Sequence, residues 1–195
     1  MLFSLAALAP VLFLYVLLAP GFAPALAAGG PVLGRFMRQV VTNGLPVVFT
    51  VNYVSFFLFA LTHRPAGSQR DPAAFLLLDL VVRVVLFIGL HALIYVFSAE
   101  WYDSFGGSPA TALSVVAPTL ARSAYLENIS GVYLYATMVS ALPLYVSAIK
   151  QSAILHSLVD LFPQKTGVIT LALLSLLLAV ISLTLVAETI GHLQG

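Results

Sequence analysis

The sequence predicts an all-α, polytopic integral membrane protein, a bundle of about five transmembrane helices with a short amphipathic interfacial helix. Hydrophobic residues make up 61% of the 195 residues, against roughly half in soluble chains. Charged residues make up 8%, against about a quarter, and the mean hydropathy is +1.07. A soluble protein of this size needs far more polar surface, so we expect residues 1–195 to form a single membrane domain.

Five apolar runs have about the length that a helix needs to cross ~30 Å of hydrocarbon at 1.5 Å per residue. They cover residues 2–19, 40–61, 75–97, 129–149 and 167–187. Of the 15 charged side chains in the chain, 13 lie outside these runs. This partition of charge is the strongest support for five spans.

The first run could also be a secretion signal, because the stretch Ala25-Leu26-Ala27 after it is typical of a cleavage site. A signal peptide carries positive charge before its apolar core, and the first basic residue here is Arg35. We therefore interpret residues 2–19 as a membrane span.

The third run contains an intramembrane polar pair, Asp79 and Arg83, whose i, i+4 spacing places both side chains on one helix face. His91 lies eight residues beyond Arg83 on nearly the same face. Charges in hydrocarbon are costly, so they usually face protein or water and mark ion or proton pathways. The functional interpretation is a relay or a docking site, and the structural one is a neutralised pair that extends toward the near interface.

His91 is also a candidate ligand for a haem or a chlorophyll-type pigment. His192 is predicted near the same side of the membrane, but about 16 Å away in height by the helix rise. Two axial ligands to one haem lie at similar heights, so a bis-His haem is not favoured. A single-ligand role and a hydrogen bond to a partner both remain open for His91, and no cofactor other than lipid is required.

The connecting segments give interfacial signals. Trp101 and Tyr102 are candidate interface anchors, because these side chains favour the headgroup layer. Residues 109–121 are moderately apolar but contain Pro118, which indicates an interfacial or re-entrant piece. Residues 150–166 carry apolar side chains at helical spacing, which predicts a short amphipathic helix lying on the bilayer.

The last two runs each carry a line of small or hydroxyl side chains at alternating spacings of three and four, which favours close helix packing. The line in residues 167–187 and just beyond is Ala172, Ser175, Ala179, Ser182, Val186 and Thr189, and the line in residues 129–149 is Tyr133, Thr137, Ser140, Leu144 and Ser147. We expect the two lines to pack on each other, and the alternative is that one of them binds a second protein. Gly44, Pro46 and Pro143 interrupt spans, which can open a binding site or be ordinary in membrane helices.

Chemical motifs are missing from the sequence. Polar groups gather on the C-terminal side, but their spacing matches no metal loop, so we expect solvated side chains and no metal site; they are Glu100, Asp103, Glu127, Glu188 and His192. Cysteine is absent, the net charge is +1, and no basic block favours nucleic acid. We find no hydrolase or metalloprotease motif, which argues against an enzyme.

The function that this pattern favours is a non-catalytic accessory subunit of a larger inner-membrane complex, of respiratory or photosynthetic type, whose partners are the lipid bilayer and other membrane subunits. The alternative is a small transporter or channel that uses Asp79, Arg83 and His91, and the third is a membrane-embedded lipid enzyme. Arg outnumbers Lys six to two, which is typical of GC-rich bacteria. Four basic residues on the predicted N-terminal side against three on the other favour a cytoplasmic N-terminus.

Overall fold

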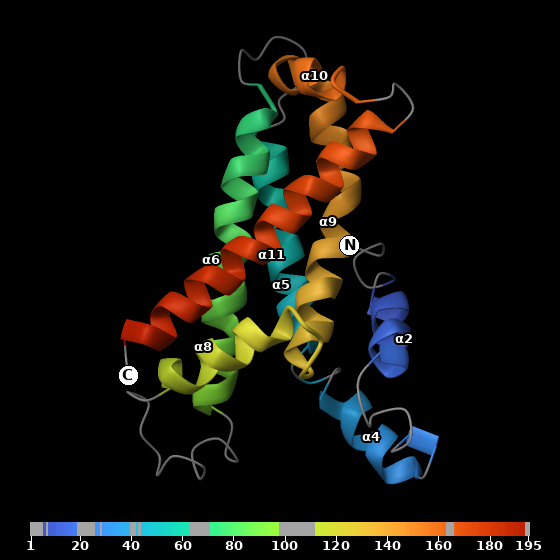
Figure 1. The fold of residues 1–195 in the computed structure, drawn as a ribbon, viewed down its shortest axis with the longest axis vertical. Helices are drawn as coiled ribbons and strands as arrows, with labels where there is room; N and C mark the ends of the chain where they lie inside the picture. The colour runs from blue at the N-terminus through green and yellow to red at the C-terminus, as the bar shows by residue number, and fades with distance from the viewer. Residues whose placement is uncertain are drawn as a thin grey trace.

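The described residues of the computed structural model are helical or lie in short turns, and they contain no strand. They are residues 6, 8–18, 26–27, 29–39, 42, 44–62, 71–97, 112–162 and 166–193. The helices, drawn in Figure 1, are α2 (Leu8–Leu18), α4 (Gly30–Gln39), α5 (Leu45–Thr62), α6 (Ala73–Phe97), α8 (Ala112–Ser123), α9 (Ser130–Gln151), α10 (Ala153–Val159) and α11 (Gly167–Leu193). The all-α prediction is confirmed for this part of the chain.

Four helices, α5, α6, α9 and α11, are long and apolar enough to cross a membrane, and they support a multi-pass membrane protein. They correspond to the second through fifth predicted runs. Within the first predicted run the structure describes α2, which has 11 residues, fewer than the roughly 20 that a span needs. The count of five spans therefore stays a prediction.

Helix α9 forms the centre of the bundle. In its most apolar 18-residue stretch 67% of the residues are buried, against 22–33% in the other three long helices. Its buried face carries small residues such as Gly131, Ala136 and Ala141, which let neighbouring backbones approach closely. In Figure 1 α5 and α6 stand along α9, α11 crosses the bundle diagonally, and α8 and α10 lie at opposite ends.

Helix α8 runs through Pro118 and packs on α11, α6 and α9, so most of the predicted interfacial or re-entrant piece is a helix. A turn organised by Asn128 joins α8 to α9. The Asn128 Oδ1 accepts from Ser123 Oγ at 2.9 Å and from the Ser130 amide at 3.0 Å, while its Nδ2 donates to the Thr119 carbonyl at 2.8 Å. A Cβ on Gly131 would lie 2.7 Å from the Ser123 carbonyl oxygen, so only glycine permits this close return.

The opposite end is held by Asp71, just before α6. Its Oδ1 accepts from the Ala73 amide at 2.8 Å and from Ser152 Oγ, and its Oδ2 accepts from the Ile154 amide at 3.1 Å. The carboxylate thus joins the N-terminus of α6 to that of α10, the helix that lies within the predicted amphipathic segment. Partial burial alone would raise the pKa of Asp71, but the hydrogen bonds, led by that from Ser152, hold the pKa below its ordinary value.

Candidate functional site

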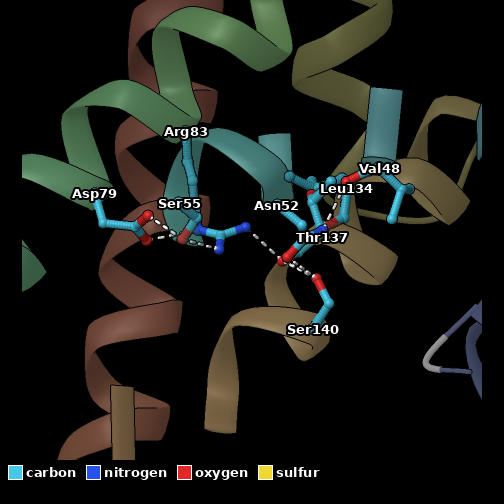
Figure 2. Close-up of polar contacts among 8 residues, drawn as sticks. All are labelled: Val48, Asn52, Ser55, Asp79, Arg83, Leu134, Thr137 and Ser140. Carbon is cyan, nitrogen blue, oxygen red and sulfur yellow. Dashed lines mark hydrogen bonds and ion pairs between the residues drawn. The ribbon is translucent and has the colours of Figure 1, made fainter. Parts of the chain in front are cut away.

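The intramembrane pair predicted from the i, i+4 spacing lies in the middle of the bundle. Arg83 Nε donates to Asp79 Oδ2 at 2.6 Å, and the two side chains are 1% and 0% exposed. Both side chains are enclosed by protein, whereas their height relative to a membrane interface stays a prediction. Figure 2 shows both side chains reaching from α6 into the space between α5 and α9.

Groups from two other helices complete the pair. On α5, Ser55 Oγ donates to Asp79 Oδ1 and accepts from Arg83 Nη2 at 2.7 Å. On α9, the Thr137 carbonyl oxygen accepts from Arg83 Nη1 at 2.8 Å. Each nitrogen of the guanidinium and each oxygen of the carboxylate therefore has a protein partner.

Asn52 and Ser140 continue this network between α5 and α9. Ser140 Oγ lies 2.8 Å from both Asn52 Oδ1 and the Thr137 carbonyl oxygen, so its one proton is shared between them. Asn52 Nδ2 donates to the Val48 carbonyl at 2.7 Å. We call these six buried residues the polar layer: Asn52, Ser55, Asp79, Arg83, Thr137 and Ser140.

The polar layer is a closed structure. Its two charges cancel. A single uncompensated charge at the centre of a membrane would cost about 3 kcal/mol on insertion scales, and about 10 kcal/mol or more for an isolated helix in simulations. Every polar heavy atom of the Asp79–Arg83 pair has a protein partner, and neither side chain is exposed. In this arrangement the layer joins α5, α6 and α9 and fixes their relative height.

Tyr145 of α9 places a hydroxyl beside the polar layer. Its hydroxyl is buried, has no hydrogen-bond partner among the described residues, and lies within electrostatic reach of both Asp79 and Arg83. The ring packs edge-on against Phe75, with centroids 6.1 Å apart. The hydroxyl is therefore a polar atom that can form a hydrogen bond with Asp79 or Arg83 if the two separate.

His91 lies further along α6 and is 2% exposed. Its Nδ1 is 2.8 Å from the Phe87 carbonyl oxygen, an acceptor, so Nδ1 carries the proton and Nε2 presents a lone pair. That Nε2 has no partner in the described structure. The ring is surrounded by Phe87, Tyr133 and Tyr95, with centroids 4.2, 5.7 and 6.5 Å away.

This tautomer suits a ligand role, because a metal-bound histidine commonly donates its other ring N–H to a carbonyl. The space around the ring argues the other way. Tyr133 lies so close to Gly44 that a Cβ there would meet its ring at 2.0 Å, and neither of the two hollows described below is lined by His91. A pigment or haem at His91 stays a prediction.

The other candidate polar residues are not brought to the layer. Glu188 and His192 lie on the last turns of α11, facing α8, and Glu127 is exposed in the turn before α9. Glu100, Asp103, Trp101 and Tyr102 lie outside the described residues. Among the described residues, no three potential metal ligands gather in one place.

The two predicted packing lines meet the interior to different extents. On α9 the first four positions, Tyr133 to Leu144, are buried, whereas on α11 only Ala172 and Ala179 of the predicted line are fully buried, Ser175 and Ser182 are half-buried, and the last two are exposed. The buried positions of α11 are Gly167, Ala172, Leu176, Ala179, Leu183 and Ala187. Helices α9 and α11 do pack on each other, and α11 also packs on α8.

The side of α11 next to this buried face lines an apolar groove of about 460 Å³ between α6, α8 and α11, which we call the outer groove. Its lining residues are Leu80, Val81, Val84, Val85, Ile88, Gly89, Leu113, Ser182, Val186 and Ile190. The Ser182 hydroxyl has no partner in the described structure, whereas the hydroxyls of Ser175, Thr184 and Thr189 bond back to carbonyls of α11. A Cβ on Gly89 would meet nothing within 4 Å, so the groove is open there.

Sequence reasoning missed Ser55 and Tyr145. Ser55 follows Asn52 by three residues and so shares its helix face, a signal that could have placed both against a polar neighbour. Nothing in the local pattern distinguishes Tyr145 from an interfacial tyrosine. No family model, no curated protein and no solved structure matches this chain.

Proposed function

We propose that the chain is a non-catalytic accessory subunit of a larger inner-membrane complex, and that it acts through helix–helix packing. The observation that carries this proposal is the closure of the polar layer. Asp79 and Arg83 are the buried charges of the described spans, and all their polar atoms are bonded to each other, to Ser55 or to the Thr137 carbonyl. A bundle whose interior charges are fully engaged offers its outer surface for interaction.

The outer groove is where we expect the partner to bind, and the occupant that suits it is a transmembrane helix of another subunit. Small residues on facing helices, Gly89 of α6 and Ser182 of α11, allow a third helix to approach closely. The free Ser182 hydroxyl favours a protein over a lipid chain, because a partner helix can supply a hydrogen bond across the interface and a hydrocarbon chain cannot. Each such bond contributes about 0.6 kcal/mol in membranes.

Site-specific photo-cross-linking in native membranes tests this proposal. A benzoylphenylalanine at Val81, a groove-lining residue that is exposed, should give one discrete adduct with a different polypeptide, whereas the same probe at Leu177, an exposed position of α11 outside the groove, should not. Gly89→Leu fills the groove without a clash at Cβ, so this variant should fold normally and lose the adduct. The adduct band on a native gel also shows, by its absorption spectrum, whether the assembly carries a pigment.

Two results would contradict the proposal. Equal adducts from Val81 and Leu177 would mean that the groove has no special role. An adduct at twice the mass of the chain would mean that a second copy, and not another subunit, occupies the groove.

A small transporter or channel is the second candidate, and the unpartnered Tyr145 hydroxyl beside the pair favours it. In that mechanism the hydroxyl would take over from one member of the pair when Asp79 and Arg83 separate. Asp79→Asn should then abolish flux into liposomes, while the exposed change Asp160→Asn leaves it intact. Flux that is absent from the unaltered protein, or unchanged in Asp79→Asn, removes this candidate.

We further propose that the membrane is a bacterial inner membrane and that the end carrying α10 faces the cytoplasm. Support comes from the four basic residues that the sequence assigns to that end, against Arg35, Arg38 and Arg122 elsewhere. They are Lys150, near the end of α9, and Arg64, Arg70 and Lys165. The chain has no cysteine, so single-cysteine variants at Ser157 and Glu127 report directly on each side. An impermeant maleimide applied outside spheroplasts should label Glu127→Cys and spare Ser157→Cys, and the reverse labelling would overturn this orientation.

A further inference from the structure

A second hollow of about 360 Å³ lies between the C-terminal halves of α8 and α11, which we call the end hollow. Its volume is in the range of small-ligand sites, about 300–1,000 Å³. Three polar side chains line it, Arg122 from α8 and Glu188 with His192 from α11. The remaining wall is apolar and consists of Pro118, Ala121, Ala187 and Gly191.

The opposite charges in the end hollow do not form an ion pair with each other. Arg122 Nε donates to the Pro118 carbonyl of its own helix at 3.3 Å. Within the described structure neither Arg122 nor Glu188 forms an ion pair, and Glu188 and His192 have no hydrogen bond. A cation and an anion therefore face one hollow from two helices, and both are free to bind a ligand that carries the complementary two charges.

The position of the hollow along α11 indicates the headgroup layer of the bilayer. The helix has 27 residues, about 40 Å at 1.5 Å per residue, which exceeds the ~30 Å of hydrocarbon. The apolar run of α11 ends at Ala187, and Glu188 is the first charged residue after it. Polar and charged side chains at this level meet lipid headgroups, while the apolar wall continues toward the hydrocarbon.

We propose that the end hollow binds the headgroup of a zwitterionic phospholipid with a primary ammonium, that is, a phosphatidylethanolamine. Its phosphate would accept from the free Nη groups of Arg122, with His192 as a second donor, and its ammonium would donate to Glu188. A trimethylated headgroup has no N–H to donate to the carboxylate. A purely anionic headgroup would meet the negative charge of Glu188 without a compensating group.

Native mass spectrometry of the full chain in mild detergent measures this preference. The probes are dioleoyl phosphatidylethanolamine, phosphatidylcholine and phosphatidylglycerol at equal concentration, and the readout is the fraction of protein with one bound lipid. We expect phosphatidylethanolamine to be bound about three- to tenfold more than either other lipid, a difference typical of one charge-assisted contact.

Exposed-residue variants locate the site. Glu188→Gln should reduce phosphatidylethanolamine binding to the level of phosphatidylcholine, and Arg122→Gln should weaken binding of all three lipids. Glu127→Gln is the matched control, since that carboxylate is exposed and does not line the hollow, and it should keep the preference. The thermal unfolding midpoint of each variant shows that it is folded.

Several results would overturn the proposal. Equal binding of the three lipids, or an unchanged preference in Glu188→Gln, would mean that the hollow does not select this headgroup. A preference for phosphatidylglycerol that Arg122→Gln removes would identify an anion site. Complete displacement of the lipid by soluble O-phosphoethanolamine would mean that the ligand is a free amine phosphate and not a membrane lipid.

Discussion

The chain contains two sets of one carboxylate and one guanidinium, and the two sets differ in burial and in their polar contacts. Asp79 and Arg83 lie 2.6 Å apart with almost no exposure, and every polar atom of the two is bonded. Glu188 and Arg122 line one hollow at the end of the bundle, are exposed, and form no ion pair with a described residue. The same chemical groups are closed in one place and open in the other.

The surroundings explain the difference. Inside the hydrocarbon a lone charge is costly, so the pair has to form and its spare donors and acceptors need partners. At the headgroup level water and lipid solvate each charge, so pairing adds at most about 1 kcal/mol. The inner set therefore serves the fold, and the outer set is available for binding.

The largest effect should come from breaking the inner pair. Arg83→Met leaves the Asp79 carboxylate buried without its cation, and we expect a loss of about 3–5 kcal/mol in the free energy of unfolding. Asp79→Leu combined with Arg83→Met should recover most of that loss, because no charge remains and the Thr137 carbonyl still accepts from Ser140. Reversible unfolding in mixed micelles measures both, and a double variant as unstable as the single one would show that the pair stabilises the fold beyond charge cancellation.

A smaller effect should follow from Ser55→Ala. This change removes one acceptor of Arg83 and one donor to Asp79 while leaving the pair itself in place. We expect a loss of about 1–3 kcal/mol, the cost of leaving buried polar groups unsatisfied. Ser157→Ala, on the exposed face of α10, is the control in the same unfolding measurement, and equal values for the two variants would mean that the α5 contact is not needed.

The Asp71 carboxylate lies at the end of the bundle that carries α10, and its contribution to the free energy of unfolding depends on pH. Its hydrogen bonds hold the pKa below the ordinary 3.8, so its contribution is fully present above that value and is lost as pH falls through the lower folded pKa. Because the side chain is partly exposed, we expect no more than about 1 kcal/mol. Asp71→Asn should lower stability at pH 7, and the variant and the unaltered chain should come together once the pH is below the folded pKa, which itself lies below 3.8. A gap that persists there would contradict this expectation.

The smallest effect on stability should come from the outer set. Arg122→Gln and Glu188→Gln should each change the free energy of unfolding in lipid-free detergent by less than about 0.5 kcal/mol, as is usual for surface substitutions. A destabilisation of either variant as large as that of Arg83→Met would contradict the conclusion that only the inner set stabilises the fold.

The sequence predicts the part of the inner site that lies within a single helix. The i, i+4 spacing of Asp79 and Arg83 is a property of one helix, so it could be predicted without knowing any neighbour. The contributions of Ser55 and the Thr137 carbonyl depend on which spans are adjacent, and a single sequence does not contain that information. The same limit applies to the end hollow, whose charges Arg122 and Glu188 lie more than 60 residues apart in the sequence.

The packing line on α11 shows a second kind of limit. The predicted line follows an average spacing of 3.5 residues, whereas the buried positions Ala172, Leu176, Ala179, Leu183 and Ala187 are spaced by four, three, four and four. A straight helix drifts by about 20° per heptad relative to the 3.5-residue repeat. The two lines therefore coincide at Ala172 and Ala179 and separate toward the C-terminus, where Val186 and Thr189 point outward.

The central claim is that the closed polar layer maintains the fold while the outer groove carries the interaction. We would test this by cross-linking from position 81 in the Asp79→Leu, Arg83→Met double variant. We expect a folded variant that gives the same partner adduct as the unaltered chain, because the groove does not include either residue. A variant that unfolds at a similar midpoint but loses the adduct would mean that the charges themselves take part in the function.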